Sequence, residues 1–181
     1  MRVITGIARG RKLKVLEGDS VRPTTDKVKE SIFSAIQFDI EGRRVLDLFA
    51  GSGQLGIEAI SRGAESATFI DNSNAALDVI RDNVANVGFS KTAHIIKSDY
   101  ASYLLMTPDR FDIAFVDPPY GTGVLQNALE ILPRVMNSYG IIICEHPVKD
   151  VLPQQVEGFK IYKTYKYGKI AVTIYRNEVV E

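Results

Sequence analysis

The chain has few of the residues on which several classes of protein depend. Cys144 is its one cysteine, so no disulfide can form within the chain, and we expect a reducing, cytoplasmic location. His94 and His146 lie far apart, so the sequence predicts no metal site. No run approaches the roughly 18 apolar residues of a membrane span, and the N-terminus lacks the apolar core of a signal peptide. These absences argue against a secreted, membrane-spanning or metal-dependent protein.

Net charge is absent as well, because 22 basic residues balance 22 acidic ones, which by itself argues against a nucleic-acid partner. The distribution of charge is uneven, however. Residues 1–16 carry five basic side chains and no acidic one, and we predict that Arg9, Arg11 and Lys12 in this basic arm contact RNA phosphates. A second acid-free cluster of lysines and tyrosines, at residues 160–169, is interpreted as a solvated edge hairpin whose lysines discourage aggregation.

The hydrophobic content is sufficient for one core. At 181 residues and 45% hydrophobic content, we expect a single domain over residues 1–181. Residues 1–16 are predicted to form a small β-hairpin, residues 17–21 a hinge, and residues 22–181 the catalytic core. Residues 159–175, with Gly168 in the middle, are predicted to form a second hairpin.

Strand-like and helix-like patterns alternate along the core. The predicted strands are residues 45–49, 67–71, 93–97, 113–117 and 141–144, and the predicted helices are residues 25–38, 55–62, 74–87 and 123–136. This order indicates a doubly wound α/β fold with a mostly parallel, seven-stranded, Rossmann-like sheet to which the C-terminal hairpin adds an antiparallel strand. In such folds ligands bind at the carboxyl ends of the strands.

A glycine-rich turn follows the first predicted strand. Gly51 and Gly53 allow the backbone to approach a ligand closely, and Gly56 allows the next helix to pack tightly on the sheet. The spacing satisfies G-x-G-x-x-G, and Asp71 follows Gly51 by 20 residues at the end of the second strand. Taken alone, this pattern fits a nicotinamide dinucleotide site equally well.

Acidic residues stand at the ends of the predicted strands. Asp47, Asp71, Asp99 and Asp117 all occupy such positions, which places four acids on one rim of the sheet. The carboxylate of Asp47 suits a ligand with a positive sulfonium and amino group, whereas it would repel a pyrophosphate. Asp47 therefore favours S-adenosylmethionine over a dinucleotide.

The apolar strand of residues 111–116 runs directly into Asp117-Pro118-Pro119-Tyr120. The two prolines hold this corner extended, so that the Asp117 carboxylate and the Pro118 carbonyl can accept both hydrogens of an exocyclic amine. Tyr120 can stack on the base that carries the amine. This arrangement predicts methyl transfer to nitrogen, with Asp117, Pro118, Pro119 and Tyr120 as the catalytic residues.

These segments together resemble a known family. The chain contains, in order, RVITGIARGRKL, RPTTDKVKESIF, DLFAGSGQLGIEAISRGA, FIDNSNAAL, SDYASYL and FVDPPYGTG. They resemble the class I methyltransferases of the RsmD type, which methylate the N2 amine of a guanine in bacterial 16S ribosomal RNA. The resemblance extends from Arg2 to Arg176.

The resemblance implies roles for individual residues. Residues 47–53 would surround the methionine part of S-adenosylmethionine, Asp71 would bind the ribose, and Asp99 with Tyr100 would flank the adenine. The implied cofactor residues are Thr24, Asp47, Phe49, Gly51, Gly53, Asp71, Asn72, Asp99 and Tyr100. Arg22 and Thr24 would help to close the pocket, and Arg22 is also expected to contact RNA. The implied partner is 16S ribosomal RNA, free or within the small subunit, and a monomer is expected.

Two alternatives remain open from the residues alone. The Asp-Pro-Pro-Tyr corner does not identify the base, so methylation of an adenine N6 amine in DNA is the second hypothesis. A DNA enzyme usually needs an added recognition module, and a chain of 181 residues leaves little room for one. The third hypothesis is an oxidoreductase domain that binds NAD through the glycine-rich turn.

Overall fold

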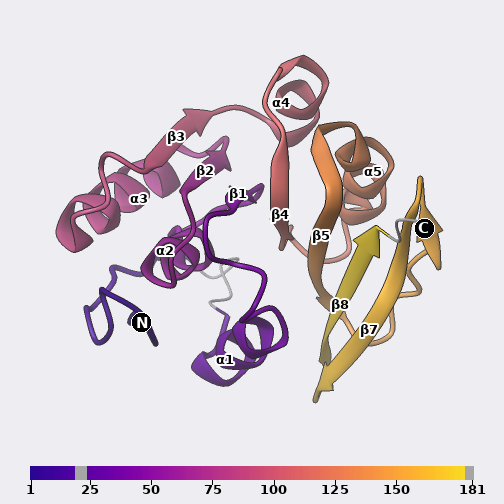
Figure 1. The fold of residues 1–181 in the computed structure, drawn as a ribbon, viewed down its shortest axis with the longest axis horizontal. Helices are drawn as coiled ribbons and strands as arrows, with labels where there is room; N and C mark the ends of the chain where they lie inside the picture. The colour runs from indigo at the N-terminus through magenta and orange to yellow at the C-terminus, as the bar shows by residue number, and fades with distance from the viewer. Residues whose placement is uncertain (19–23, 178–181) are drawn as a thin grey trace.

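The computed structural model describes residues 1–18 and 24–177 and contains one mixed sheet covered by helices on both faces (Figure 1). The strands lie in the order β3-β2-β1-β4-β5-β8-β7-β6. Their bounds are β1 Arg44–Asp47, β2 Ser66–Asp71, β3 Ala93–Lys97, β4 Phe111–Val116, β5 Met136–Pro147, β6 Gln155–Val156, β7 Phe159–Tyr167 and β8 Ile170–Asn177. Strands β1 to β5 run parallel to one another, β8 pairs antiparallel with β5, and β7 and β6 continue the sheet as antiparallel strands. The predicted doubly wound α/β class is confirmed.

The helices follow the predicted alternation. Their bounds are α1 Asp26–Ala35, α2 Gln54–Ser61, α3 Asn74–Val87, α4 Tyr100–Met106 and α5 Val124–Ile131, followed by the 3-10 helix η1 Leu132–Val135. α1 begins where Thr25 caps it, with the Thr25 hydroxyl accepting from the Val28 amide at 3.3 Å. Each helix within residues 1–18 and 24–177 is too short or too polar to span a bilayer.

The central strands are buried on both faces, which explains their continuous apolar runs. Alternate side chains of a strand point to opposite faces, so β4 places Ile113 and Phe115 in one core and Ala114 and Val116 in the other. The first core also contains residues of α1, α2 and α3, and the second contains residues of α4 and α5. Figure 1 shows these two groups of helices on opposite sides of the sheet.

The described residues form eight strands, where the sequence predicts seven. The additional strand, β6, has two residues and pairs at the sheet edge, with Gln155 opposite Lys160 and Val156 opposite Phe159. The intervening residues, Glu157 and Gly158, both have positive φ, at 41° and 87°, as tight hairpin turns require. A two-residue strand is too short to show an alternating pattern, so periodicity could not predict it.

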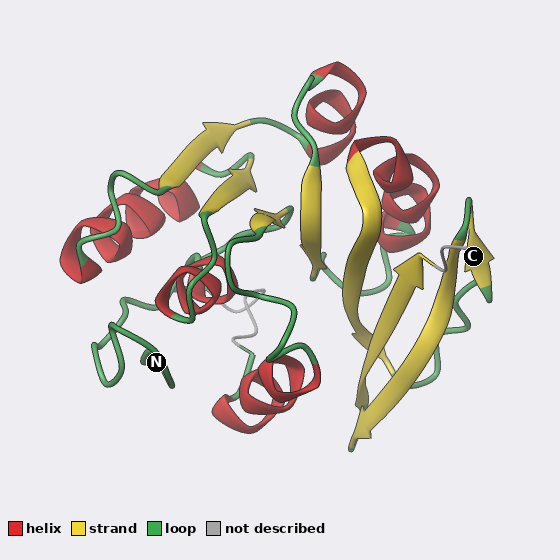
Figure 2. Cartoon of the chain, viewed as in Figure 1, coloured by secondary structure: helices red, strands yellow, loops and turns green. Residues whose placement is uncertain are grey.

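The basic arm is the second difference from prediction. In place of a hairpin ladder, it forms one isolated antiparallel bridge between Arg2 and Lys12, and Figure 2 shows residues 1–16 as loop. The arm turns back on itself through a few backbone hydrogen bonds, such as that from the Val3 amide to the Arg11 carbonyl at 2.9 Å, and it also bonds to α2, as the Ile7 amide does to the Ser61 carbonyl at 2.8 Å. Gly6 is essential to this approach, because a Cβ there would lie 1.8 Å from the Ser61 carbonyl oxygen. Of the predicted hinge at residues 17–21, residues 19–21 lie outside the described part.

Candidate active site

A cavity of about 430 Å³ opens at the carboxyl ends of the parallel strands, where the fold places ligands. It is lined by residues that follow β1, β2, β3 and β4, and this arrangement brings together most of the predicted site. The predicted residues that line it are Thr24, Asp47, Phe49, Gly51, Asp71, Asn72, Asp99, Tyr100, Asp117, Pro118, Pro119 and Tyr120. Residues from four separate strand ends therefore share one cavity.

Two predicted residues are placed differently. Gly53 does not line the cavity; it caps α2 with φ at 80°, and its amide donates to the Ala50 carbonyl at 2.7 Å. Arg22 lies outside the described residues. Gly56 packs as predicted, because a Cβ there would lie 2.4 Å from the Phe69 ring. The glycines after Gly51 thus set the turn and the position of α2 on the sheet.

Asp47 is the buried acid of this cavity. Its Oδ2 accepts a hydrogen bond from the Gly56 amide at 3.1 Å. Burial raises the pKa of Asp47 to about 7, and the nearby Asp71 adds to this effect, while the Gly56 amide opposes it. No Lys or Arg within residues 1–18 and 24–177 forms an ion pair with Asp47. A cationic ligand in the cavity would supply the missing opposite charge.

Asp71 fixes the glycine-rich turn from the end of β2. Its Oδ2 accepts from the Gly51 amide at 3.0 Å, and its Oδ1 accepts from the Ser73 amide at 2.9 Å. Ser73 in turn caps α3. Each carboxylate oxygen keeps a second lone pair, so Asp71 can still accept from ligand hydroxyls.

Asp99 and Tyr100 form the end of the cavity near β3. Asp99 caps α4, and its Oδ1 accepts from the amides of Ala101 and Ser102, each at 3.1 Å. Hydrogen bonds from Ser102 are the main reason that the pKa of Asp99 lies below its ordinary value. The Tyr100 ring lies 5.3 Å from the Phe49 ring, centroid to centroid, at 43°. Two aromatic rings and a carboxylate here suit a flat heterocycle.

The Asp117 to Tyr120 segment is held by a residue that the sequence analysis missed. Glu145, buried near the end of β5, accepts from the Tyr120 hydroxyl at 2.9 Å and from the Thr24 hydroxyl at 2.9 Å. The same Thr24 hydroxyl lies 3.5 Å from Asp117 Oδ2. The available signal was an acidic residue directly after an apolar strand, the pattern that selected Asp47 and Asp117.

A second cavity, of about 470 Å³, lies on the other side of this segment. Pro118, Pro119 and Tyr120 line both cavities and so form the wall between them. The second cavity is completed by residues 121–123, Glu145, His146 and the loop after β5, including Lys149 and Val151. Asp117 lines the first cavity and Glu145 the second, and the Thr24 hydroxyl contacts both carboxylates.

The basic arm supplies further cavity residues that the sequence analysis did not assign. Met1, Val15 and Leu16 line the first cavity, and the Ser52 hydroxyl contacts the Met1 sulfur at 3.4 Å. These residues are ordinary apolar side chains, so their type carries no signal of a site. Their position follows only from the way in which the arm folds back over the glycine-rich turn.

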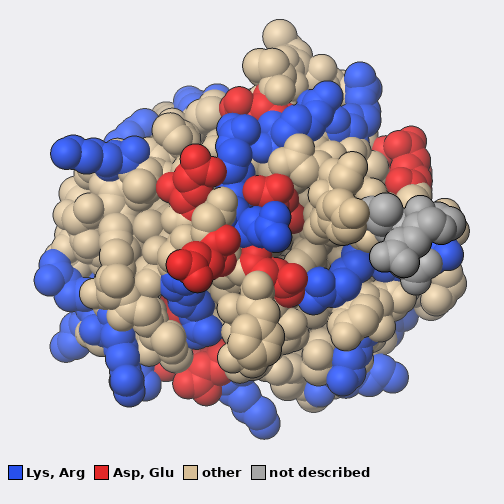
Figure 3. All heavy atoms as spheres, in the orientation of Figure 1, with Lys and Arg blue, Asp and Glu red and all other residues tan. Residues whose placement is uncertain are grey.

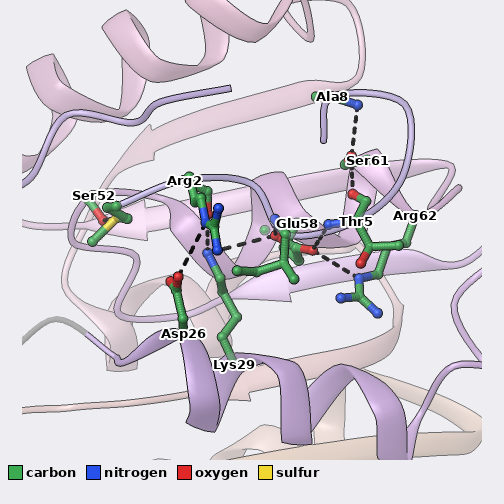
Figure 4. A network of polar contacts seen from close by, with 12 residues as sticks. Arg2, Thr5, Ala8, Asp26, Lys29, Ser52, Glu58, Ser61 and Arg62 are labelled. Carbon is green, nitrogen blue, oxygen red and sulfur yellow. Dashed lines mark hydrogen bonds and ion pairs between the residues drawn. The ribbon is translucent and has the colours of Figure 1, made fainter. Parts of the chain in front are cut away.

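A buried polar network anchors the arm to α2 (Figure 4). Glu58 accepts from the amides of Ile4 and Thr5 at 2.9 and 3.0 Å, and from Arg62 Nε at 3.0 Å. Lys29 Nζ lies 3.7 Å from Glu58, and burial lowers the pKa of Lys29. The carboxylate of Glu58 is therefore paired and hydrogen-bonded, which is the condition under which buried charges are tolerated.

The residues predicted to contact RNA lie along the exposed side of the arm. Arg9, Arg11 and Lys12 are exposed, and the Arg11 guanidinium donates to the Asn86 carbonyl. The side-chain amide of Asn86 donates to the Lys12 backbone carbonyl at 3.0 Å. This bond fixes the middle of the arm against α3. On the face shown in Figure 3, basic and acidic side chains are interspersed, so that face has no surface of a single sign.

Comparisons with known proteins agree with this geometry. The family model described as Conserved hypothetical protein 95 matches residues 1–176. YlbH of Bacillus subtilis is 40% identical over 181 residues, covering 97% of this chain and 98% of the relative. Ribosomal RNA small subunit methyltransferase D of Escherichia coli is 33% identical over 180 residues, covering 98% of this chain and 90% of the relative.

Solved structures show the same fold. The structure of yhhF from Escherichia coli is 34% identical, with a TM-score of 0.88 and coverage of 98% of each chain. SMU.776, solved in complex with SAH, is 11% identical with a TM-score of 0.70 over 82% of this chain and 49% of that one, so its likeness concerns the fold alone. The chain therefore belongs to the Conserved hypothetical protein 95 family, and the resemblance to RsmD-type proteins that its motifs predicted is confirmed.

Proposed function

We propose that this protein transfers a methyl group from S-adenosylmethionine to the exocyclic N2 amine of a guanine in 16S ribosomal RNA. The observation that supports this most directly is the position of Asp117-Pro118-Pro119-Tyr120 in the wall between two cavities. One cavity can hold the methyl donor and the other the base, so that the amine and the methyl group meet at Asp117. The relative named ribosomal RNA small subunit methyltransferase D supports ribosomal RNA as the substrate class.

The first cavity fits S-adenosylmethionine. Asp47 is a buried carboxylate with a raised pKa and no ion pair among the described residues, and it would bind the ammonium group of the methionine part. Asp71 and Asn72, which line the cavity, would accept from the ribose hydroxyls, and Asp99 with Tyr100 would contact the adenine. Phe49, Gly51 and Thr24 complete the enclosure. Gly53 does not line the cavity, and it would contribute indirectly by shaping the turn that positions Gly51.

The chemistry follows from the acceptors at the end of β4. When bound, S-adenosylmethionine would supply an electrophilic methyl group to the amine nitrogen, and its positive sulfur would keep the electron pair of the C–S bond. The Asp117 carboxylate and the Pro118 carbonyl each accept a hydrogen bond from the amine. The nitrogen lone pair is then free to attack. Tyr120 stacks on the base, and Pro119 keeps the corner rigid. The methylated amine, which then carries a positive charge, would pass one proton to the Asp117 carboxylate that accepts from it, and a neutral guanine would remain.

The basic arm completes the proposal. Arg9, Arg11 and Lys12 would contact RNA phosphates beside the cavity that the arm helps to enclose. Arg22, which the resemblance places at the pocket, is proposed for the same role. We expect the protein to act as a monomer, on the assembled small subunit or on free 16S RNA.

Transfer of labelled methyl from S-adenosylmethionine tests the proposal. The substrates are small ribosomal subunits that lack the modification, protein-free 16S RNA and duplex DNA, and the product is digested to nucleosides. Label in N2-methylguanosine from a ribosomal substrate is the expected result. Label in N6-methyladenine of DNA would overturn the substrate while keeping the chemistry, and thermal stabilisation by NADH but not by S-adenosylmethionine would overturn both.

A further inference from the structure

Glu145 is the buried one of the two acids, Glu145 and Asp150, that line the second cavity, and neither the sequence motifs nor the family comparison assigns it a role. Val116, the last residue of β4, pairs with Cys144 of β5, so the next residues, Asp117 just after β4 and Glu145 within β5, lie side by side. The Thr24 hydroxyl, which contacts both carboxylates, confirms how close they are. A base held in the second cavity with its amine at Asp117 would therefore lie beside Glu145.

The contacts of Glu145 leave it able to accept from a ligand. One oxygen accepts from Tyr120 and the other from Thr24, each through a hydroxyl at 2.9 Å. Each carboxylate oxygen has two lone pairs, so one on each oxygen remains available. Within residues 1–18 and 24–177 no Lys or Arg forms an ion pair with Glu145. The carboxylate is thus held in one orientation by neutral donors, in the wall of a cavity of about 470 Å³.

The two candidate bases differ in the group that lies beside the reactive amine. In guanine the N2 amine is flanked by N1–H, a donor, whereas in adenine the N6 amine is flanked by N1, an acceptor. A carboxylate accepts hydrogen bonds and donates none. A second acid beside the amine site therefore favours the base with a second donor beside its amine.

We propose that Glu145 accepts the N1–H of the target base and so selects guanine over adenine, an inference that rests on the proposed methylation of guanine N2. Asp117 and the Pro118 carbonyl hold the amine, and Glu145 holds the adjacent ring nitrogen, so that the Watson–Crick edge is read across the Pro-Pro-Tyr wall. Adenine would set its N1 lone pair against the Glu145 carboxylate, so that two acceptors would face each other and the adenine N1 would have no donor. Such unmatched pairs are rejected strongly.

The test uses a base that keeps the N2 amine but lacks the N1 hydrogen. The position that the wild-type protein methylates is first mapped in 16S RNA. The RNA is then prepared by ligation with guanosine, 2-aminopurine or adenosine at that position. The measured quantity is the kcat/KM ratio of guanosine to 2-aminopurine RNA. For wild type we expect this ratio to exceed about tenfold, and for Glu145→Gln to fall by about tenfold, because the glutamine amide can donate to an unprotonated N1.

A purely structural role of Glu145 predicts a different result. If Glu145 only holds Tyr120 and Thr24, then Glu145→Gln slows both RNAs equally and the ratio stays at the wild-type value, which would overturn the proposal. Tyr120→Phe is the matched control, since it removes one hydroxyl donor to Glu145 but keeps the ring. We expect it to lower both rates and keep the ratio, and a loss of selectivity equal to that of Glu145→Gln would also overturn the proposal.

If Glu145→Gln has no measurable turnover, RNA binding is measured in place of kcat/KM. Competition between guanosine and 2-aminopurine RNAs gives a ratio of Kd values without catalysis, and stabilisation by S-adenosylmethionine shows that the variant is folded. A Kd ratio that falls from wild type to Glu145→Gln supports the role of Glu145, and an unchanged ratio refutes it. Failure of wild type to produce N2-methylguanosine would refute the proposed function itself, which is a separate outcome.

Discussion

Two buried carboxylates, Asp47 beside α2 and Glu58 within α2, differ in how their charge is compensated. Glu58 has two cationic neighbours and accepts from two arm amides, whereas Asp47 accepts from one amide and has no ion pair within the described residues. The neighbours of Glu58 are all part of the protein, so its charge is compensated as soon as the chain folds. The cavity beside Asp47 leaves space for a cation to come from outside. A buried charge without a partner therefore marks a ligand site, and a paired one marks structure.

The largest expected effect concerns Asp117, another acid of the first cavity. Asp117→Ala removes an acceptor from the reacting amine, so we expect kcat to fall by at least about a hundredfold while the fold is retained. Methyl transfer and thermal unfolding are measured together. Asp78→Ala, at an exposed acid of α3, serves as the control and should keep full activity. A folded Asp117→Ala protein with wild-type activity would refute the mechanism.

Glu58 should behave in the opposite way, with its main effect on stability. Glu58→Ala leaves Lys29 buried without its carboxylate and two arm amides without their acceptor. We expect the free energy of unfolding to fall by about 3–5 kcal/mol. Urea denaturation measures this, with Glu65→Ala, at an exposed glutamate, expected to change it by less than about 0.5 kcal/mol. A decrease of the same small size for Glu58→Ala would show that the network contributes little.

Asp47 should destabilise the protein without its ligand, in a pH-dependent way. Its folded-state pKa of about 7 lies above the ordinary 3.8, so the folded state holds the proton more tightly, and stability falls as pH rises from about 4 to about 7. Asp47→Asn does not titrate. The free energy of unfolding of Asp47→Asn minus that of wild type should therefore increase between about pH 4 and pH 7, by up to about 4 kcal/mol, and stay constant at higher pH.

The same acid should make ligand binding depend on pH in the reverse direction. If S-adenosylmethionine binds the ionised Asp47 carboxylate as proposed, its affinity for wild type should weaken as pH falls below about 7, and Asp47→Asn should bind weakly at every pH. Calorimetric titration between about pH 5.5 and 8.5 measures both proteins. Equal affinity for the variant and wild type at the alkaline end of this range would argue that Asp47 does not contact the cation.

The smallest expected effect is at the exposed side of the arm. Replacing Arg9, Arg11 and Lys12 by alanine should weaken RNA binding and reduce the slope of log Kd against log salt by about one for each phosphate that the arm no longer neutralises. Cofactor affinity should not change, because these side chains do not line the cavity. Filter binding at several salt concentrations measures the slope. An unchanged slope would place the RNA on another surface.

The site shows where prediction from sequence succeeds and where it fails. Asp47, Asp71, Asp99 and Asp117 were found because each stands at the end of an apolar strand, and parallel strands bring such ends to one edge. Glu145 stands in the same kind of position but was missed, because its role depends on Tyr120 and Thr24, which lie 25 and 121 residues away in the chain. Met1, Val15 and Leu16 were missed because apolar side chains look alike inside and outside a site.

Local patterns in the sequence were enough to predict the order of strands and helices, the glycine-rich turn and the acids that follow the strands, because these depend on periodicity and on the geometry of parallel sheets. The folded chain was needed to establish that β6 pairs with β7, that Glu58 pairs with Lys29, and that the arm folds over α2 instead of forming a ladder. These choices depend on contacts between distant segments. Burial sets their energies, and burial exists only once the chain has folded.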